Sequence, residues 1–142
     1  MRRIFFFALL SSFLFACTSQ DVKIDTKQSQ SHYKLGLELA QLRLFKNALE
    51  EFDLAIKFNP ADPKLYRKKG IILFGMKKYE EAKINFQKTL EFDPNDVQAH
   101  INLGMVHYTS GNKDEALKSW EHAVGLNPDD NDSKALNNIG NI

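Results

Sequence analysis

The residue with the most distinctive chemistry in this sequence is its single cysteine, Cys17. With one cysteine, the chain can form no intramolecular disulfide, and it contains no CxxC or Cys/His metal-binding pattern. Cys17 follows two basic residues, Arg2 and Arg3, and an almost wholly apolar run from Ile4 to Leu14. A helix needs about 20 apolar residues to cross a bilayer, so this run is too short. The order of basic, apolar and polar residues predicts a secretory signal peptide over residues 1–16.

The segment Leu14-Phe15-Ala16-Cys17 resembles the lipobox of bacterial lipoproteins, although Phe15 is larger than the usual residue at its position. The resemblance implies cleavage after Ala16 and a covalent diacylglyceryl and N-acyl lipid on Cys17, with no other cofactor. Two or more acyl chains make membrane attachment stable. Thr18 stands where an aspartate would favour the inner membrane, so the resemblance implies anchoring in the cell envelope at the outer membrane, on its periplasmic side. The alternative is a soluble periplasmic or secreted protein without a lipid anchor.

Two further groups of side chains are of types used in metal binding or catalysis. His100 and His107 lie seven residues apart, on one helix face, but no third ligand has the spacing that a metal site needs. Ser110-Gly111-Asn112 is a turn, because no strand precedes it as in the elbow of a nucleophilic serine. The sequence therefore predicts a protein that is not an enzyme and has neither a metal nor a small-molecule substrate. An enzyme or metal protein is the second class, which assays for hydrolase activity and bound metal would test.

The charge of the chain argues against nucleic-acid binding. The full sequence has 19 basic and 18 acidic residues. Without the signal peptide, which contains Arg2 and Arg3, 17 basic residues face 18 acidic ones, a net charge of −1. Proteins that bind nucleic acid need a concentrated basic face, so we expect no nucleic-acid partner.

An internal repeat of 34 residues is the strongest pattern in the chain. Repeats of this length are typical of stacked supersecondary units. The repeated columns are Gly36, Gly70 and Gly104; Ala48, Ala82 and Ala116; Phe52, Phe86 and Trp120; Ala55, Thr89 and Ala123; and Pro60, Pro94 and Pro128. Each period contains two stretches in which apolar residues recur every three to four positions, which predicts two helices. The prolines end the second helix, and Asp62 and Asp96 provide N-cap oxygens for the next one.

These columns resemble the tetratricopeptide-repeat (TPR) family, whose unit is a helix–turn–helix of 34 residues. The resemblance covers residues 29–130, with Lys69, Thr89 and Lys113 as departures from the usual residue types. It implies an all-α fold, a right-handed superhelical array of helix–turn–helix repeats. The predicted organisation is a flexible tether over 17–28, repeats at 29–62, 63–96 and 97–130, and a short C-terminal capping helix at 131–142.

The TPR resemblance implies that a protein partner binds in a concave groove lined by the first helix of each repeat. The residues predicted to contact it are Tyr33, Leu37, Lys64, Arg67, Ile71, Phe74, Ile101, Met105 and Tyr108. Leu37, Ile71 and Ile101 have packing against neighbouring repeats as the alternative. With Lys64, Arg67 and Lys68 as a basic rim, such a groove suits an amphipathic helix or an extended peptide with an acidic flank.

One known type of TPR site is absent from the sequence. TPR domains that bind chaperone tails hold a carboxylate with a clamp of Lys, Asn and Arg side chains. The corresponding positions here are Tyr33, Leu37, Lys68, Gln98 and Asn102, so the clamp is not reproduced. The sequence as a whole predicts a lipid-anchored, non-catalytic adaptor for protein partners of the bacterial cell envelope, with its oligomeric state left open.

Overall fold

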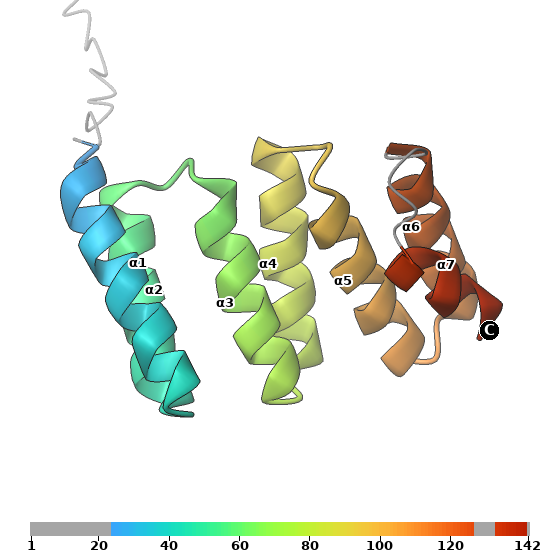
Figure 1. The fold of residues 1–142 in the computed structure, drawn as a ribbon, viewed down its shortest axis with the longest axis horizontal. Coiled ribbons are helices and arrows are strands. Elements are labelled where there is room, and N and C mark those ends of the chain that lie inside the picture. The colour runs from blue at the N-terminus through green and yellow to red at the C-terminus, as the bar shows by residue number, and fades with distance from the viewer. Residues whose placement is uncertain (1–23, 127–132, 142) are drawn as a thin grey trace, which may run out of the picture.

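The computed structural model describes residues 24–126 and 133–141, which form seven helices and no strand (Figure 1). The helices are α1 (Thr26–Gln41), α2 (Phe45–Phe58), α3 (Pro63–Gly75), α4 (Tyr79–Phe92), α5 (Val97–Thr109), α6 (Lys113–Leu126) and α7 (Ser133–Gly140). None of these helices is both long enough and apolar enough to cross a bilayer. Cys17 and the predicted signal peptide lie outside the described residues.

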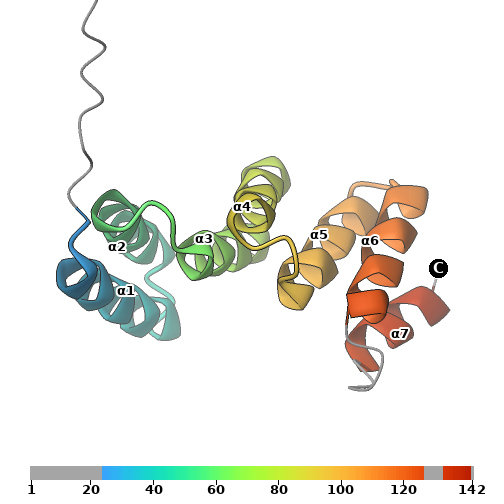
Figure 2. The ribbon, with the colours of Figure 1, turned by 90° about the horizontal axis from the view of Figure 1, so that it is seen from above.

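The helices are arranged as three antiparallel pairs, α1–α2, α3–α4 and α5–α6, which stack side by side (Figure 1). Seen from above, α1, α3, α5 and α7 follow a shallow arc, and α2, α4 and α6 lie on its outer side (Figure 2). We call the inner side of this arc, formed by α1, α3 and α5, the concave face. The predicted all-α array of helix–turn–helix units is confirmed.

An aspartate begins the first helix of every pair. The side chains of Asp25, Asp62 and Asp96 each accept a hydrogen bond from a backbone N–H in the first turn of the helix that follows. The caps predicted at Asp62 and Asp96 are confirmed. Asp25 was expected in the flexible tether over 17–28, and this part of the prediction is wrong. The Asp25 cap starts α1 at Thr26, and the Asp25 backbone N–H also donates to the carbonyl of Phe58 (2.9 Å).

A residue with left-handed backbone conformation ends the first helix of every pair. These residues are Arg43 (φ 60°), Lys77 (φ 61°) and Gly111 (φ 82°), which are spaced by one repeat length. At each turn two backbone N–H groups donate back to carbonyls in the last turn of the helix, for example Lys78 to Leu73 (2.9 Å). Glycine adopts this conformation without steric cost, whereas in Arg43 and Lys77 the Cβ atom makes it less favourable.

Within each pair, an aromatic ring from the second helix lies against a glycine of the first. Phe52, Phe86 and Trp120 are almost completely buried and are the largest side chains of the core. The glycines opposite them are Gly36, Gly70 and Gly104. A Cβ atom added to these glycines would lie 3.2 Å, 2.7 Å and 2.2 Å, respectively, from the nearest ring atom. At Gly70 and Gly104 the helices can therefore approach this closely only because these positions carry no side chain, whereas at Gly36 the contact is tight but a small shift of the Phe52 ring would accommodate a Cβ atom.

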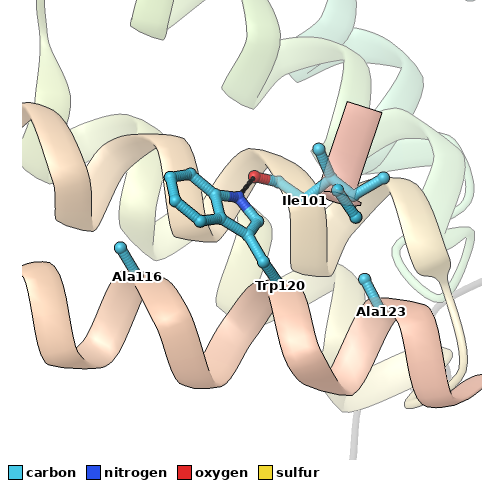
Figure 3. Close-up of a cluster of buried hydrophobic side chains, with 5 residues drawn as sticks. Ile101, Ala116, Trp120 and Ala123 are labelled. Carbon is cyan, nitrogen blue, oxygen red and sulfur yellow. Dashed lines mark hydrogen bonds between the residues drawn. The ribbon is translucent and has the colours of Figure 1, made fainter. Parts of the chain in front are cut away.

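The third pair has the tightest of these contacts. The Nε1–H of Trp120 donates to the backbone carbonyl of Ile101 at 3.0 Å, across the interface between α6 and α5 (Figure 3). Ile101 is itself buried, and Ala116 and Ala123 lie on either side of Trp120 along α6 (Figure 3). The indole is therefore held both by packing and by a buried hydrogen bond.

The C-terminal helix covers the end of the array. α7 has eight residues, Ser133–Gly140, and is shorter than the capping helix predicted over 131–142. Ala135 is fully buried in the cluster that contains Ile101 and Trp120, and Ile139 packs against the same cluster. The Nδ2 of Asn138 donates weakly to the sulfur of Met105 (3.5 Å). α7 thus closes the core of the third pair in the way a further repeat would.

We predict that Gly104→Ala lowers the free energy of unfolding by about 1–3 kcal/mol, because the added methyl group overpacks the core and displaces Trp120 from its hydrogen bond. Urea denaturation followed by circular dichroism measures the change. Gly70→Ala should cost less, and Gly36→Ala least, in the order of the three Cβ distances. Gly75→Ala is the control, because its Cβ would meet no described atom within 4 Å. Equal losses for Gly75→Ala and Gly104→Ala would contradict the close-approach argument.

We also predict that Lys77→Gly stabilises the protein by about 1 kcal/mol, because glycine removes the cost of the left-handed conformation at an exposed position. The reverse change, Gly111→Lys, should destabilise it by a similar amount. Both effects are measured as shifts of the urea midpoint. A shift in the same direction for both variants would show that the turn conformation is not what decides their stability.

Candidate functional site

One end of the concave face contains a pocket of about 390 Å³ between the starts of α1 and α3. Most of the side chains around it are polar. The lining residues are Thr26, Ser29, Gln30, Tyr33, Asn59, Asp62, Lys64 and Leu65. Two of the residues predicted to contact a partner, Tyr33 and Lys64, therefore meet at this pocket.

The walls of the pocket are held by contacts within the first pair and by the cap of α3. The buried hydroxyl of Ser29 donates to the carbonyl of Ala55 (2.9 Å), which ties α1 to α2. The ring of Tyr33 lies 6.0 Å from that of Phe52, at a tilt of 58°. Asp62 accepts the backbone N–H of Lys64 (3.0 Å), so its carboxylate is turned toward the start of α3. Lys64, which is exposed, is the one lysine or arginine among the residues that line the pocket, so its ammonium group provides the positive charge there.

Exposed apolar side chains lie farther along the same helices, toward their C-terminal ends. Ile71 on α3 and Tyr108 on α5 are 40% and 37% exposed, respectively. Phe74 is half-buried against Tyr79 (ring centroids 5.5 Å apart), and Leu37 is half-buried against the core of the first pair. The concave face therefore has a polar part near the helix starts and an apolar part near the helix ends.

Two predicted contact residues are engaged in packing. Ile101 is only 4% exposed and lies inside the core beneath α6 and α7, so the prediction that it contacts a partner is wrong. The physical reason is that α7 packs against Ile101. The corresponding residue of the second repeat, Arg67, is likewise engaged by the element that follows, through Asp96 at the start of α5. Met105 is half-buried and touches Asn138 of α7, so only part of its side chain is available.

Arg67 has a structural partner that the sequence reasoning did not identify. Its Nε lies 2.8 Å from Oδ2 of Asp96, and its side chain is only 20% exposed. The N–H is not directed at an acceptor, so the contact is an ion pair without an aligned hydrogen bond. Asp96 thus caps α5 with one oxygen and attracts Arg67 of α3 with the other. The expectation that Arg67 is free to contact a partner is corrected accordingly.

The sequence reasoning also missed a contact that joins consecutive repeats. The hydroxyl of Tyr66 donates to the carbonyl of Pro60 (2.7 Å), and Nε2–H of His100 donates to the carbonyl of Pro94 (2.9 Å). Both donors lie at the same position of their repeats, 34 residues apart, which is the signal that would have revealed them. Burial raises the pKa of Tyr66, so its hydroxyl remains protonated as the donor.

The two histidines considered as a metal pair have separate surroundings. The ring of His100 stacks on that of His122, with centroids 4.2 Å apart. Burial lowers the pKa of His107, the nearby Lys83 lowers it further, and Glu115 and Glu80 act in the opposite direction. Over residues 24–126 and 133–141, no three or more His, Cys, Asp or Glu side chains come together as a potential metal site.

Family models described as tetratricopeptide repeat match three consecutive segments of the chain, residues 29–62, 63–96 and 97–130. Together these segments make up most of the 142 residues. A search of curated protein sequences found no match.

Solved structures of TPR domains have the same fold. The first TPR of Spaghetti (RPAP3), bound to the HSP90 peptide SRMEEVD, has a TM-score of 0.80 at 18% identity, covering 84% of this chain and 94% of that one. The Arabidopsis OM64 TPR domain has a TM-score of 0.75 at 19% identity, with 82% and 94% covered. YrrB, a TPR protein with an unusual peptide-binding site, has a TM-score of 0.71 at 27% identity, with 78% and 56% covered. From the matched repeats and the shared architecture, we conclude that this chain belongs to the tetratricopeptide-repeat family.

Proposed function

We propose that this chain is a membrane-anchored, non-catalytic adaptor of the bacterial cell envelope, which binds a peptide or helix of a protein partner on its concave face. The observation that carries the proposal is the combination of a pocket with exposed apolar side chains, Ile71 and Tyr108, on one face. Contact of a partner with such side chains removes apolar surface from water, which favours binding. TPR domains are generally non-catalytic interaction modules, which supports the absence of an enzymatic role.

The similar structures support a peptide-like partner. One contains a TPR domain with a bound HSP90 peptide, and another is a TPR protein with a peptide-binding site. At 18% identity the likeness to the first concerns the fold alone. The clamp positions of chaperone-binding TPR domains hold Tyr33, Leu37, Lys68, Gln98 and Asn102 here, so we do not extend the HSP90 peptide to this chain.

The proposed anchor is the lipid on Cys17, in the segment that resembles a lipobox. Because α1 begins at Thr26, after its cap Asp25, only eight residue steps separate the cap from Cys17. A chain of that length spans at most roughly 30 Å. An anchored protein would therefore hold its first repeat close to the membrane surface, with the outer membrane as the proposed location. The alternative is a soluble periplasmic or secreted TPR protein without a lipid.

The anchor predicts that Cys17→Ala abolishes incorporation of labelled palmitate and moves the protein from the detergent phase to the aqueous phase in a phase-partitioning assay. The reason is that Cys17 provides the only thiol for lipid attachment. Ser19→Ala is the matched control and should keep both properties. Undiminished label in Cys17→Ala would refute the lipid anchor while leaving the partner-binding proposal intact.

The concave-face proposal predicts that Ile71→Ser combined with Tyr108→Ala removes most partner capture, because a few central side chains carry most of the binding energy of an interface, about 2 kcal/mol or more each. The measurement is a cross-linking pull-down from envelope fractions, quantified by mass spectrometry. Circular dichroism checks that the variant remains folded.

The matched control for this experiment removes two exposed apolar side chains from the opposite side of the array. Leu54 on α2 and Ile84 on α4 are 38% and 62% exposed. Leu54→Ser combined with Ile84→Ser should therefore leave capture unchanged. If the same partners survive the concave-face variant, or are lost only in the control, the binding surface lies elsewhere.

A further inference from the structure

The charges of this array are divided between its two helix sets. The helices of the concave face, α1, α3 and α5, contain six Lys or Arg residues and one acidic residue, Glu38. The helices of the outer side, α2, α4 and α6, each contain two lysines and three acidic residues. A chain that is nearly neutral overall therefore has net positive charge on the first helices of its pairs, taken together, and net negative charge on the second helices. Such a separation orients charged partners as they approach.

Acidic side chains at the helix starts reduce this positive charge only in part. The carboxylates of Asp25, Asp62 and Asp96 accept backbone N–H groups at the first turns of α1, α3 and α5. Asp96 also pairs with Arg67. Counting these three, the inner side still has more basic than acidic groups.

Two lysines on α3 remain available for a partner. Lys69 pairs with Asp53 and Arg67 with Asp96, whereas Lys64 and Lys68 make no salt bridge with any described residue. Lys64 and Lys68 are four residues apart, so they lie on one face of α3. This face continues to the exposed Ile71. Two unpaired cations and an apolar contact thus follow one another along the same helix.

The cationic groups and the apolar side chains lie toward opposite edges of the concave face. α1, α3 and α5 run parallel, so all three begin at the same edge of the array (Figure 1). Lys64, Lys68 and the polar pocket lie toward that edge. Ile71, Phe74 and Tyr108 lie toward the opposite edge, where the helices end. A segment lying across the helices meets cations along one of its sides and apolar side chains along the other.

We propose that the partner segment is an acidic amphipathic one, whose carboxylates contact Lys64 and Lys68 and whose apolar side chains contact Ile71 and Tyr108. This inference rests on the proposed concave-face binding and specifies its chemistry. Charge complementarity favours acidic over basic segments and accelerates their association. An anionic membrane surface is the competing occupant for lysines of this kind. It fits less well, because the pocket of about 390 Å³ is recessed between α1 and α3, whereas a bilayer surface is flat.

The test selects displayed random 16-residue peptides on the immobilised full chain, purified in mild detergent. The expected result is enrichment of peptides that are more acidic than the input and contain spaced apolar residues. The variant Lys64→Glu with Lys68→Glu should bind the enriched peptides about tenfold more weakly at low salt, and raised salt should reduce the difference. The matched control, Lys57→Glu with Lys118→Glu, changes two exposed lysines of α2 and α6 and should bind as the wild type does.

Carbodiimide cross-linking locates the contact, because it joins a carboxylate to a lysine amine without a spacer. We expect the enriched peptides to be joined to Lys64 or Lys68, and not to Lys57 or Lys118. Enrichment without an acidic bias, or cross-links confined to the outer helices, would overturn this inference and leave the proposed peptide binding in place. Absence of any enrichment would instead count against peptide binding itself.

Vesicles test the competing occupant. The full chain and the Lys64→Glu, Lys68→Glu variant are sedimented with neutral phosphatidylcholine vesicles and with vesicles that contain phosphatidylglycerol. Equal sedimentation of the two proteins supports a peptide as the ligand of these lysines. Stronger sedimentation of the wild type with the anionic vesicles, together with no acidic bias among the selected peptides, would assign the lysines to a membrane surface and overturn the proposal.

Discussion

The close approach of two helices at a glycine is the contact on which the rest of this structure depends. In each pair a large ring fills the space that a side chain would occupy, and at Gly104 an added Cβ would lie only 2.2 Å from Trp120. The ring is buried in this way in all three pairs, and each core also includes a buried side chain of the helix that follows: Ile72 of α3, Val106 of α5 and Ala135 of α7. This geometry sets how closely the two helices of each pair pack, whereas the contacts between pairs set how α1, α3 and α5 lie relative to one another.

Contacts between successive pairs combine apolar packing with polar contacts. Tyr66 and His100 donate to proline carbonyls of the preceding connection, and Arg67 pairs with the cap of the next pair. Such contacts involve nearest neighbours only, as is typical of solenoid proteins. The binding face is consequently assembled from parts that are positioned one interface at a time. Arg67 illustrates the result, since a residue at a groove position serves instead to connect α3 to α5.

The fold could be predicted from the sequence because its main determinants recur in register. Glycine, the aromatic residue and proline each act locally, through close packing or through backbone geometry, and their spacing is visible without coordinates. The surroundings of individual site residues were harder to predict from the sequence. Ile101 is buried because α7 packs against it, whereas Ile71, at a different position of its repeat, is exposed. Asp25 lies in a polar stretch of the sequence. Its role as the cap of α1 accompanies a backbone hydrogen bond to Phe58 at the end of α2, and the sequence alone does not show that contact.

The hydrogen bond from the Asp25 backbone to Phe58 also determines how the array would respond to tension. A pulling force applied at the N-terminal end of the described chain loads this bond and the α1–α2 interface before it reaches α3. Because α1 packs mainly on α2, it would separate first, while the later pairs remain packed. The pocket between α1 and α3 would open at this first step, whereas Ile71 and Tyr108 would stay in place. Mechanical load on the chain would thus remove the polar half of the concave face and spare its apolar half.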